Sequence, residues 1–88
     1  MAKGLLEKKV DPQYPPDAKA QHIQGVVLLQ VKIDKEGSVY DVQLISGHPQ
    51  LAPAAIDAVK QWKYKPYLLN GYPVDVETQI TVNFTLAD

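Results

Sequence analysis

The chain has 88 residues, no cysteine and a formal net charge of −1. This length suits one domain with a modest core, and the lack of cysteine excludes disulfides, thiolate metal sites and thiol chemistry. The near-neutral charge argues against a dedicated nucleic-acid binder, and no apolar run approaches the ~20 residues that span a bilayer.

The N-terminal part predicts an arm followed by a short helix. Residues 1–10 are expected to be a flexible arm, or a start that is not native, ahead of a domain that covers residues 11–88. The proline-rich run 11–16 should be extended, because proline disfavours helical geometry in the residue before it. Pro15 or Pro16 then opens a helix of two turns at most, PPDAKAQH.

Two strands joined by a tight turn should follow. Residues 26–34 alternate so that one face is apolar and forms the core side: Val27, Leu29, Val31 and Ile33. The turn Lys35-Glu36-Gly37 leads into a return strand over residues 38–46. In that strand Val42 and Leu44 share a face, and Val39 needs a bulge to join the core.

A long helix is predicted between Pro49 or Gln50 and Pro66. Pro53 fits only in its first turn, and Pro66 stops it. Lys60, Lys63 and Lys65 would lie in its last turns, where cations suit the helix dipole. The helical spacing rests on six residues that would form one buried row: Leu51, Ala54, Ala55, Ala58, Val59 and Trp62.

The last part predicts a hairpin and one long strand. Asn70-Gly71 is a strong turn signal between two short extended segments. From residue 74 to residue 86 the alternation is nearly perfect, and six residues should face inward: Val76, Thr78, Ile80, Val82, Phe84 and Leu86.

These elements predict an α+β fold. The order helix, strand, strand, helix, strand gives a two-layer sandwich, with the short N-terminal helix and the long helix on one face of a three-stranded sheet. The long helix returns the chain across the sheet, so the last strand should lie antiparallel beside the first. The expected strand order is 2-1-3, which leaves the last strand on an edge.

No arrangement of residues indicates an enzyme, a metal site or a cofactor. His22 and His48 lack a second metal ligand at local spacing, and both are expected to be solvated. The carboxylates Asp34, Glu36 and Asp41 surround a tight turn without a nucleophile or base partner. The lysines near Trp62 could suggest nucleic-acid binding, but Trp62 belongs to the apolar helix row, which favours core packing.

The edge of the last strand is the candidate site. It is long, regular and carries only Asp75 and Glu77 as charged residues. An exposed regular edge tends to pair with other chains and to aggregate unless it is covered or serves as a binding site. Two interpretations stay open: the N-terminal arm or a second copy of the domain covers the edge, or an extended peptide adds a strand to it.

The order of several short motifs resembles the C-terminal domain of the TonB energy-transducer family. They are Tyr14-Pro15 before a short helix, Gln24-Gly25 before a valine-rich strand, the run VKQWKYKP that ends at Pro66, and Asn70-Gly71-Tyr72-Pro73-Val74. The resemblance covers residues 10–86.

The resemblance implies a non-enzymatic periplasmic module of Gram-negative bacteria. Such a module binds the TonB box, a short extended segment of an outer-membrane transporter, and passes on a pull that derives from the proton gradient. A membrane helix and a linker, absent from this sequence, would tether it to the inner membrane and to motor proteins there. The implied partner-binding residues are Asp11, Gln13, Tyr14, Glu77, Gln79, Ile80, Thr81, Val82, Asn83 and Phe84.

The alternative is a self-associating module in which the last strand pairs with or swaps into a second copy. The resemblance extends to modules of this kind that are attached to membrane sensors. A homodimer would then occupy the same edge that a peptide would otherwise use.

Overall fold

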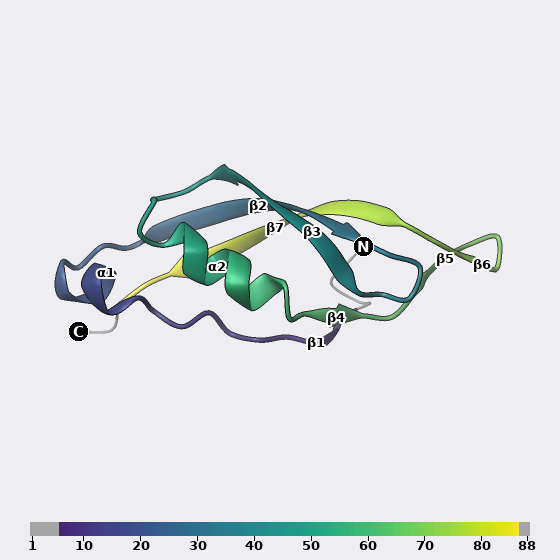
Figure 1. Cartoon of the computed structure of the whole chain (residues 1–88), viewed down its shortest axis with the longest axis horizontal. Helices are drawn as coiled ribbons and strands as arrows, with labels where there is room; N and C mark the ends of the chain where they lie inside the picture. Colours follow the sequence, from purple (N-terminus) through teal and green to yellow (C-terminus); the bar gives the residue numbers. More distant parts are fainter. Residues whose placement is uncertain (1–5, 87–88) are drawn as a thin grey trace.

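The computed structural model describes residues 6–86. Along the chain the elements are β1 (Leu6–Lys8), α1 (Pro16–Ala20), β2 (Gly25–Ile33), β3 (Val39–Ser46), α2 (Ala52–Val59), β4 (Lys63–Tyr64), β5 (Tyr67–Leu69), β6 (Tyr72–Val74) and β7 (Val76–Phe84). Figure 1 shows an elongated molecule in which α1 lies at one end and the β5–β6 hairpin at the other.

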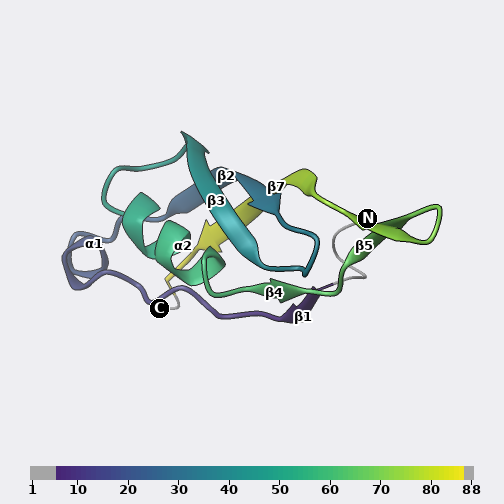
Figure 2. The ribbon, with the colours of Figure 1, turned by 45° about the vertical axis from the view of Figure 1, so that its right-hand side comes forward.

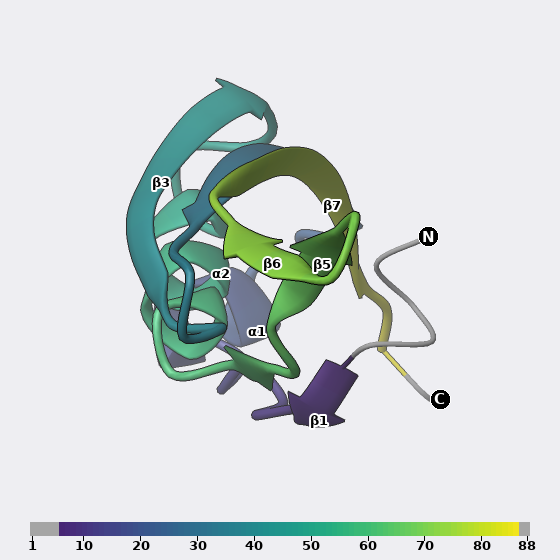
Figure 3. The same cartoon turned by 90° about the vertical axis from the view of Figure 1, so that its right-hand side faces the viewer.

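The main sheet has three antiparallel strands in the order β3-β2-β7. This confirms the predicted α+β class and the predicted strand order, with the first long strand in the centre and the last on an edge. Seen end-on, the sheet curves around α2 (Figure 3). β1 and β4 form a separate two-stranded ladder beyond the C-terminal end of α2, as Figure 2 shows.

The core lies between β2, β7 and α2. The predicted inward face of β2 is confirmed, because Val27, Leu29 and Val31 are fully buried and Ile33 is 3% exposed. Most of the predicted α2 row is buried against them: Leu51, Ala55, Ala58, Val59 and Trp62. Small alanines let the helix approach the sheet closely, while the large Trp62 ring supplies much of the buried apolar area.

The two outer strands of the sheet differ in regularity. β7 pairs with β2 without interruption from Val76 to Phe84. The pairing of β3 with β2 shifts register twice, once on either side of the segment that pairs Leu29 to Lys32. The shift beside Ile33 brings Val39 opposite it, which confirms the bulge expected there. Leu44 pairs with Leu29 yet stays 45% exposed.

The predicted length of the second helix is wrong at its C-terminal end. α2 begins close to the expected place, but it ends at Val59 and not before Pro66. Lys60 is the C-cap of α2, Gln61 follows in a turn, and Lys63 belongs to β4, so of the three lysines only Lys60 lies at the end of the helix. The reason is tertiary: the Tyr64 N–H donates to the Gly37 carbonyl oxygen at 2.8 Å instead of continuing the helix.

Gly37 holds β4 close to the β2–β3 turn. Its φ is +88°, and a Cβ at this position would lie 1.8 Å from the Tyr64 carbonyl oxygen. The Asp34 carboxylate accepts hydrogen bonds from the N–H groups of Glu36 and Ser38, both at 2.9 Å, which fixes the turn. Burial raises the pKa of the Tyr64 hydroxyl, so this side chain stays neutral in the core.

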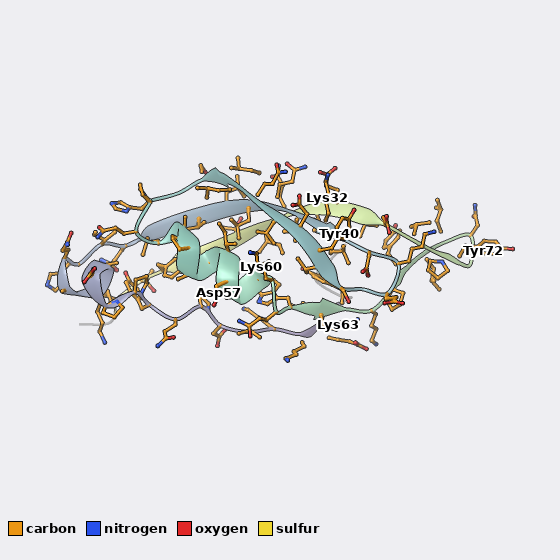
Figure 4. All side chains as sticks on the ribbon, in the orientation of Figure 1. Lys32, Tyr40, Asp57, Lys60, Lys63 and Tyr72 are labelled. Carbon is orange, nitrogen blue, oxygen red and sulfur yellow. The ribbon has the colours of Figure 1, made fainter. Side chains whose placement is uncertain are left out.

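The hairpin predicted at Asn70-Gly71 is confirmed. Leu69 pairs with Tyr72 across the turn, and both turn residues have positive φ, +53° and +84°. The hairpin extends away from the sheet, and Tyr72 lies at its tip, 74% exposed (Figure 4). Within residues 6–86, neither helix is long and apolar enough to cross a bilayer.

Gly37→Ala should destabilise the fold far more than Gly71→Ala. Both glycines have a φ near +85°, so each substitution pays the conformational penalty of about 1–2 kcal/mol. Only at Gly37 does the new Cβ meet backbone, whereas nothing lies within 4 Å at Gly71. Urea unfolding should therefore show an additional loss of about 2 kcal/mol or more for Gly37→Ala. Equal losses for the two variants would show that the contact with Tyr64 does not constrain the fold.

Candidate peptide-binding edge

Within residues 6–86, β3 and β7 are the two edge strands of the main sheet, and the outer edge of β7 is the candidate site. Among residues 6–86, β2 is the only strand that pairs with β7. In an antiparallel strand, every second residue directs its N–H and C=O away from its neighbour, so the outer edge of β7 presents a regular series of donors and acceptors. This geometry can accept another strand without any change in the sheet.

The side chains of β7 divide between two faces. Glu77, Gln79, Thr81 and Asn83 are exposed on the face away from the core. Ile80, Val82 and Phe84 are between 2% and 8% exposed and point into the core. A strand added beside β7 would therefore contact the backbone of these three residues. Its own inward side chains would lie at the margin of the core. The Gln30 amide donates to the Glu77 carboxylate at 2.7 Å, which orders one end of the outer face.

The implied site residues of the N-terminal segment lie in an extended strap, here defined as residues 9–15. Asp11 and Gln13 are exposed. Tyr14 is half-buried, its hydroxyl donates to the Ile23 carbonyl oxygen, and its ring meets that of Phe84 edge-on with 5.4 Å between centroids. Tyr14 therefore joins the strap to the end of β7.

A second attachment of the strap comes from Trp62. Its indole N–H donates to the Val10 carbonyl oxygen at 2.8 Å, and the Lys9 ammonium lies 5.9 Å from the centre of its ring. Preceding the strap, β1 pairs with β4, so the described part of the expected arm is attached to the domain. Sequence reasoning missed the polar role of Trp62, because its position in the apolar helix row indicated core packing alone.

The histidines and carboxylates do not form a site within the described chain. Both His22 and His48 are exposed, as expected. The His48 Nδ1 accepts the Gln50 N–H at 3.0 Å, which stabilises the turn before α2. Across residues 6–86 no group of three or more histidine or acidic side chains is arranged to hold a metal ion.

The family comparison agrees with this architecture. Residues 10–86 match the model of the Gram-negative bacterial TonB protein C-terminal domain. The chain belongs to the TonB family. This family consists of energy transducers and not of enzymes, in agreement with the absence of a catalytic pattern in the sequence.

Relatives from several bacteria share this region. The chain is 36% identical over 85 residues to the TonB protein of Vibrio cholerae. The aligned region covers 94% of this chain and 35% of that protein. The chain is 36% identical over 77 residues to the TonB protein of Xanthomonas campestris, with 85% and 34% covered. The chain therefore spans about a third of the length of these curated relatives.

Solved structures support the fold. The solution structure of the Pseudomonas aeruginosa TonB C-terminal domain superposes with a TM-score of 0.80 at 22% identity, covering 94% of this chain and 86% of that one. The TonB2 protein of Vibrio anguillarum gives a TM-score of 0.68 at 30% identity, with 89% and 76% covered.

Tyr14→Phe should lower the free energy of unfolding by about 0.5–1.5 kcal/mol, because it removes the hydrogen bond to the Ile23 carbonyl and keeps the ring on Phe84. Tyr72→Phe is the matched control, since its ring is 74% exposed at the hairpin tip. Chemical denaturation should detect a loss for the first variant and almost none for the second. Identical stabilities would mean that the Tyr14 hydroxyl does not hold the strap.

Proposed function

We propose that this domain binds the TonB box of outer-membrane TonB-dependent transporters by strand addition to β7, and that it transmits to them a pull derived from the proton gradient. The observation that carries the proposal is the edge of β7, which is uninterrupted and has no pairing strand on its outer side among residues 6–86. The domain would act in the periplasm, connected to the inner membrane and its motor proteins by a preceding segment of the parent protein.

The contrast between β7 and β3 supports β7 as the binding edge. A bulge adds an unpaired residue, bends the strand and breaks the even spacing of donors and acceptors. β3 has two such irregularities, whereas β7 keeps one register with β2 over its whole length. An incoming strand could therefore form a longer continuous ladder on β7 than on β3. Bulges at an edge are a known protection against unwanted pairing.

Backbone pairing suits a partner whose sequence varies. Each hydrogen bond contributes about 0.5–1.5 kcal/mol net. The loss of translational and rotational freedom on association opposes the ladder by about 4–15 kcal/mol, so backbone pairing alone would give a weak complex. Such a complex forms and dissociates readily. A ladder loaded along its strands distributes the force over several bonds, which would let a weak complex carry a brief pull.

In this proposal the implied site residues of the strap have two different roles. Asp11 and Gln13 are exposed on the strap and are available to a bound peptide. Tyr14 uses its hydroxyl and one ring edge within the domain, so its role would be to position the strap beside β7. Contact with the peptide would then come from the remaining surface of its ring.

An NMR titration of the labelled domain with a synthetic TonB-box peptide tests strand addition. Amide shifts should concentrate in Val76–Phe84 and around Gln13. Two N-methylated versions of the peptide make the test specific, because methyl groups on the amides that face β7 remove the ladder and methyl groups on the opposite amides leave it intact. The version methylated on the amides that face β7 should lose binding, and the version methylated on the opposite amides should keep it.

Two results would contradict the proposal. Equal binding by both N-methylated peptides would show that no backbone ladder forms. An absence of shifts at millimolar peptide, with β7 amides already protected from hydrogen exchange, would show that the edge is occupied. Light scattering over a concentration series would then identify self-association, the competing use of the same edge.

A further inference from the structure

A hollow lies between the outer edge of β7 and the strap. It has a volume of about 210 Å³ and is bounded by β7 from Thr81 to Asn83, by the strap at Pro12 and by Trp62. Lys9 and Asp11 complete its rim. We call this space the Trp62 hollow. It is next to the edge on which the proposed strand would be added.

The floor and the rim of the Trp62 hollow differ in chemistry. Trp62 and Val82 are 9% and 6% exposed, and together with Pro12 they present apolar surface. Lys9 and Asp11 are exposed and stand at the rim, where their charges can stay hydrated, and the Lys9 ammonium lies over the indole ring, 5.9 Å from its centre. Such a site favours an apolar side chain and disfavours a buried charge.

Strand geometry indicates which residue of a bound peptide would reach the hollow. Directly opposed residues of neighbouring strands direct their side chains to the same face. Val82 points to the core face, so the peptide residue opposite Val82 would direct its side chain to that face and into the Trp62 hollow. Beside Phe84, the next inward residue, the Tyr14 ring already occupies the space.

We propose that the Trp62 hollow is a specificity subsite that accepts one leucine-sized apolar side chain from the strand added to β7. This inference rests on the proposed strand addition and adds a sequence preference to it. The subsite also sets the register of the peptide, because a slip by one residue would turn the apolar side chain to the solvent face and leave the hollow empty.

The test uses a synthetic TonB-box peptide and variants in which each apolar residue in turn becomes alanine. Trp62 is the only tryptophan of the chain, so its fluorescence reports on the hollow directly. One alanine variant should bind roughly tenfold more weakly, because it loses the buried part of one apolar side chain. The same variant should lose the change in Trp62 emission that the parent peptide produces.

A domain variant tests the geometry of the rim. Lys9→Ala removes a side chain that lines the hollow and whose ammonium lies over the Trp62 ring, so it widens the hollow. A peptide with phenylalanine at the sensitive position should then gain roughly fivefold in affinity relative to the leucine peptide. Lys35→Ala is the matched control. It makes the same change in charge at an exposed turn between β2 and β3 and should leave the preference unchanged.

The outcomes separate the subsite from strand addition. Suppose that the peptide shifts the β7 amides. If the alanine scan then shows no dominant position, or if the Trp62 emission stays constant, the subsite is overturned and strand addition stays in place. A preference that does not change in Lys9→Ala would overturn the assigned rim. If no peptide shifts the β7 amides, strand addition itself fails and the subsite fails with it.

Discussion

The pairing of β2 on both of its sides is the constraint on which the rest of the structure depends. Its inward residues Val27, Leu29 and Val31 are fully buried, so a slip of one position would move this entire row to the solvent face. The register of β2 therefore determines that of β7, whose nine residues follow it without interruption. The regular edge of β7 is a consequence of the burial of its neighbour.

The strap depends on contacts between residues that are distant in the sequence. The bond from Trp62 to Val10 joins residues 52 positions apart, and β1 meets β4 across a similar separation. A few hydrogen bonds hold the strap, whereas β2 and β7 are held by a buried row of side chains. Hydrogen exchange should be faster in the strap than in the sheet, because opening the strap exposes less apolar surface.

Local patterns predicted the elements that local forces determine. The alternation of β2 and β7, the turn at Gly37 and the hairpin at Asn70-Gly71 follow from side-chain period and turn chemistry. The end of α2 could not be predicted in this way, because Trp62 continues the helical row of apolar residues. A contact from another part of the chain decides the outcome, since Tyr64 donates its N–H to the Gly37 carbonyl.

The same distinction applies to the candidate site. The exposed edge of Val76–Phe84 was visible in the sequence, because a long strand at the end of a short sheet has one unpaired side. The pattern of side chains did not place Tyr14 or Trp62 beside that edge. Only the family resemblance implied Tyr14 there, and nothing in the sequence indicated Trp62. Each makes a hydrogen bond to a backbone carbonyl, of Ile23 and Val10 respectively, and no side-chain pattern reveals which carbonyl a distant ring will reach.

The irregular pairing of β3 has a consequence for how copies of the domain can associate. If two copies met through their β7 edges, the contact would be the same on both sides and would close on a two-fold axis. Growth beyond two copies would need β3 as a second attachment point, and its two register shifts make that edge a poor template. Strand pairing through this sheet would therefore end at a pair of domains and would not continue into open-ended fibres.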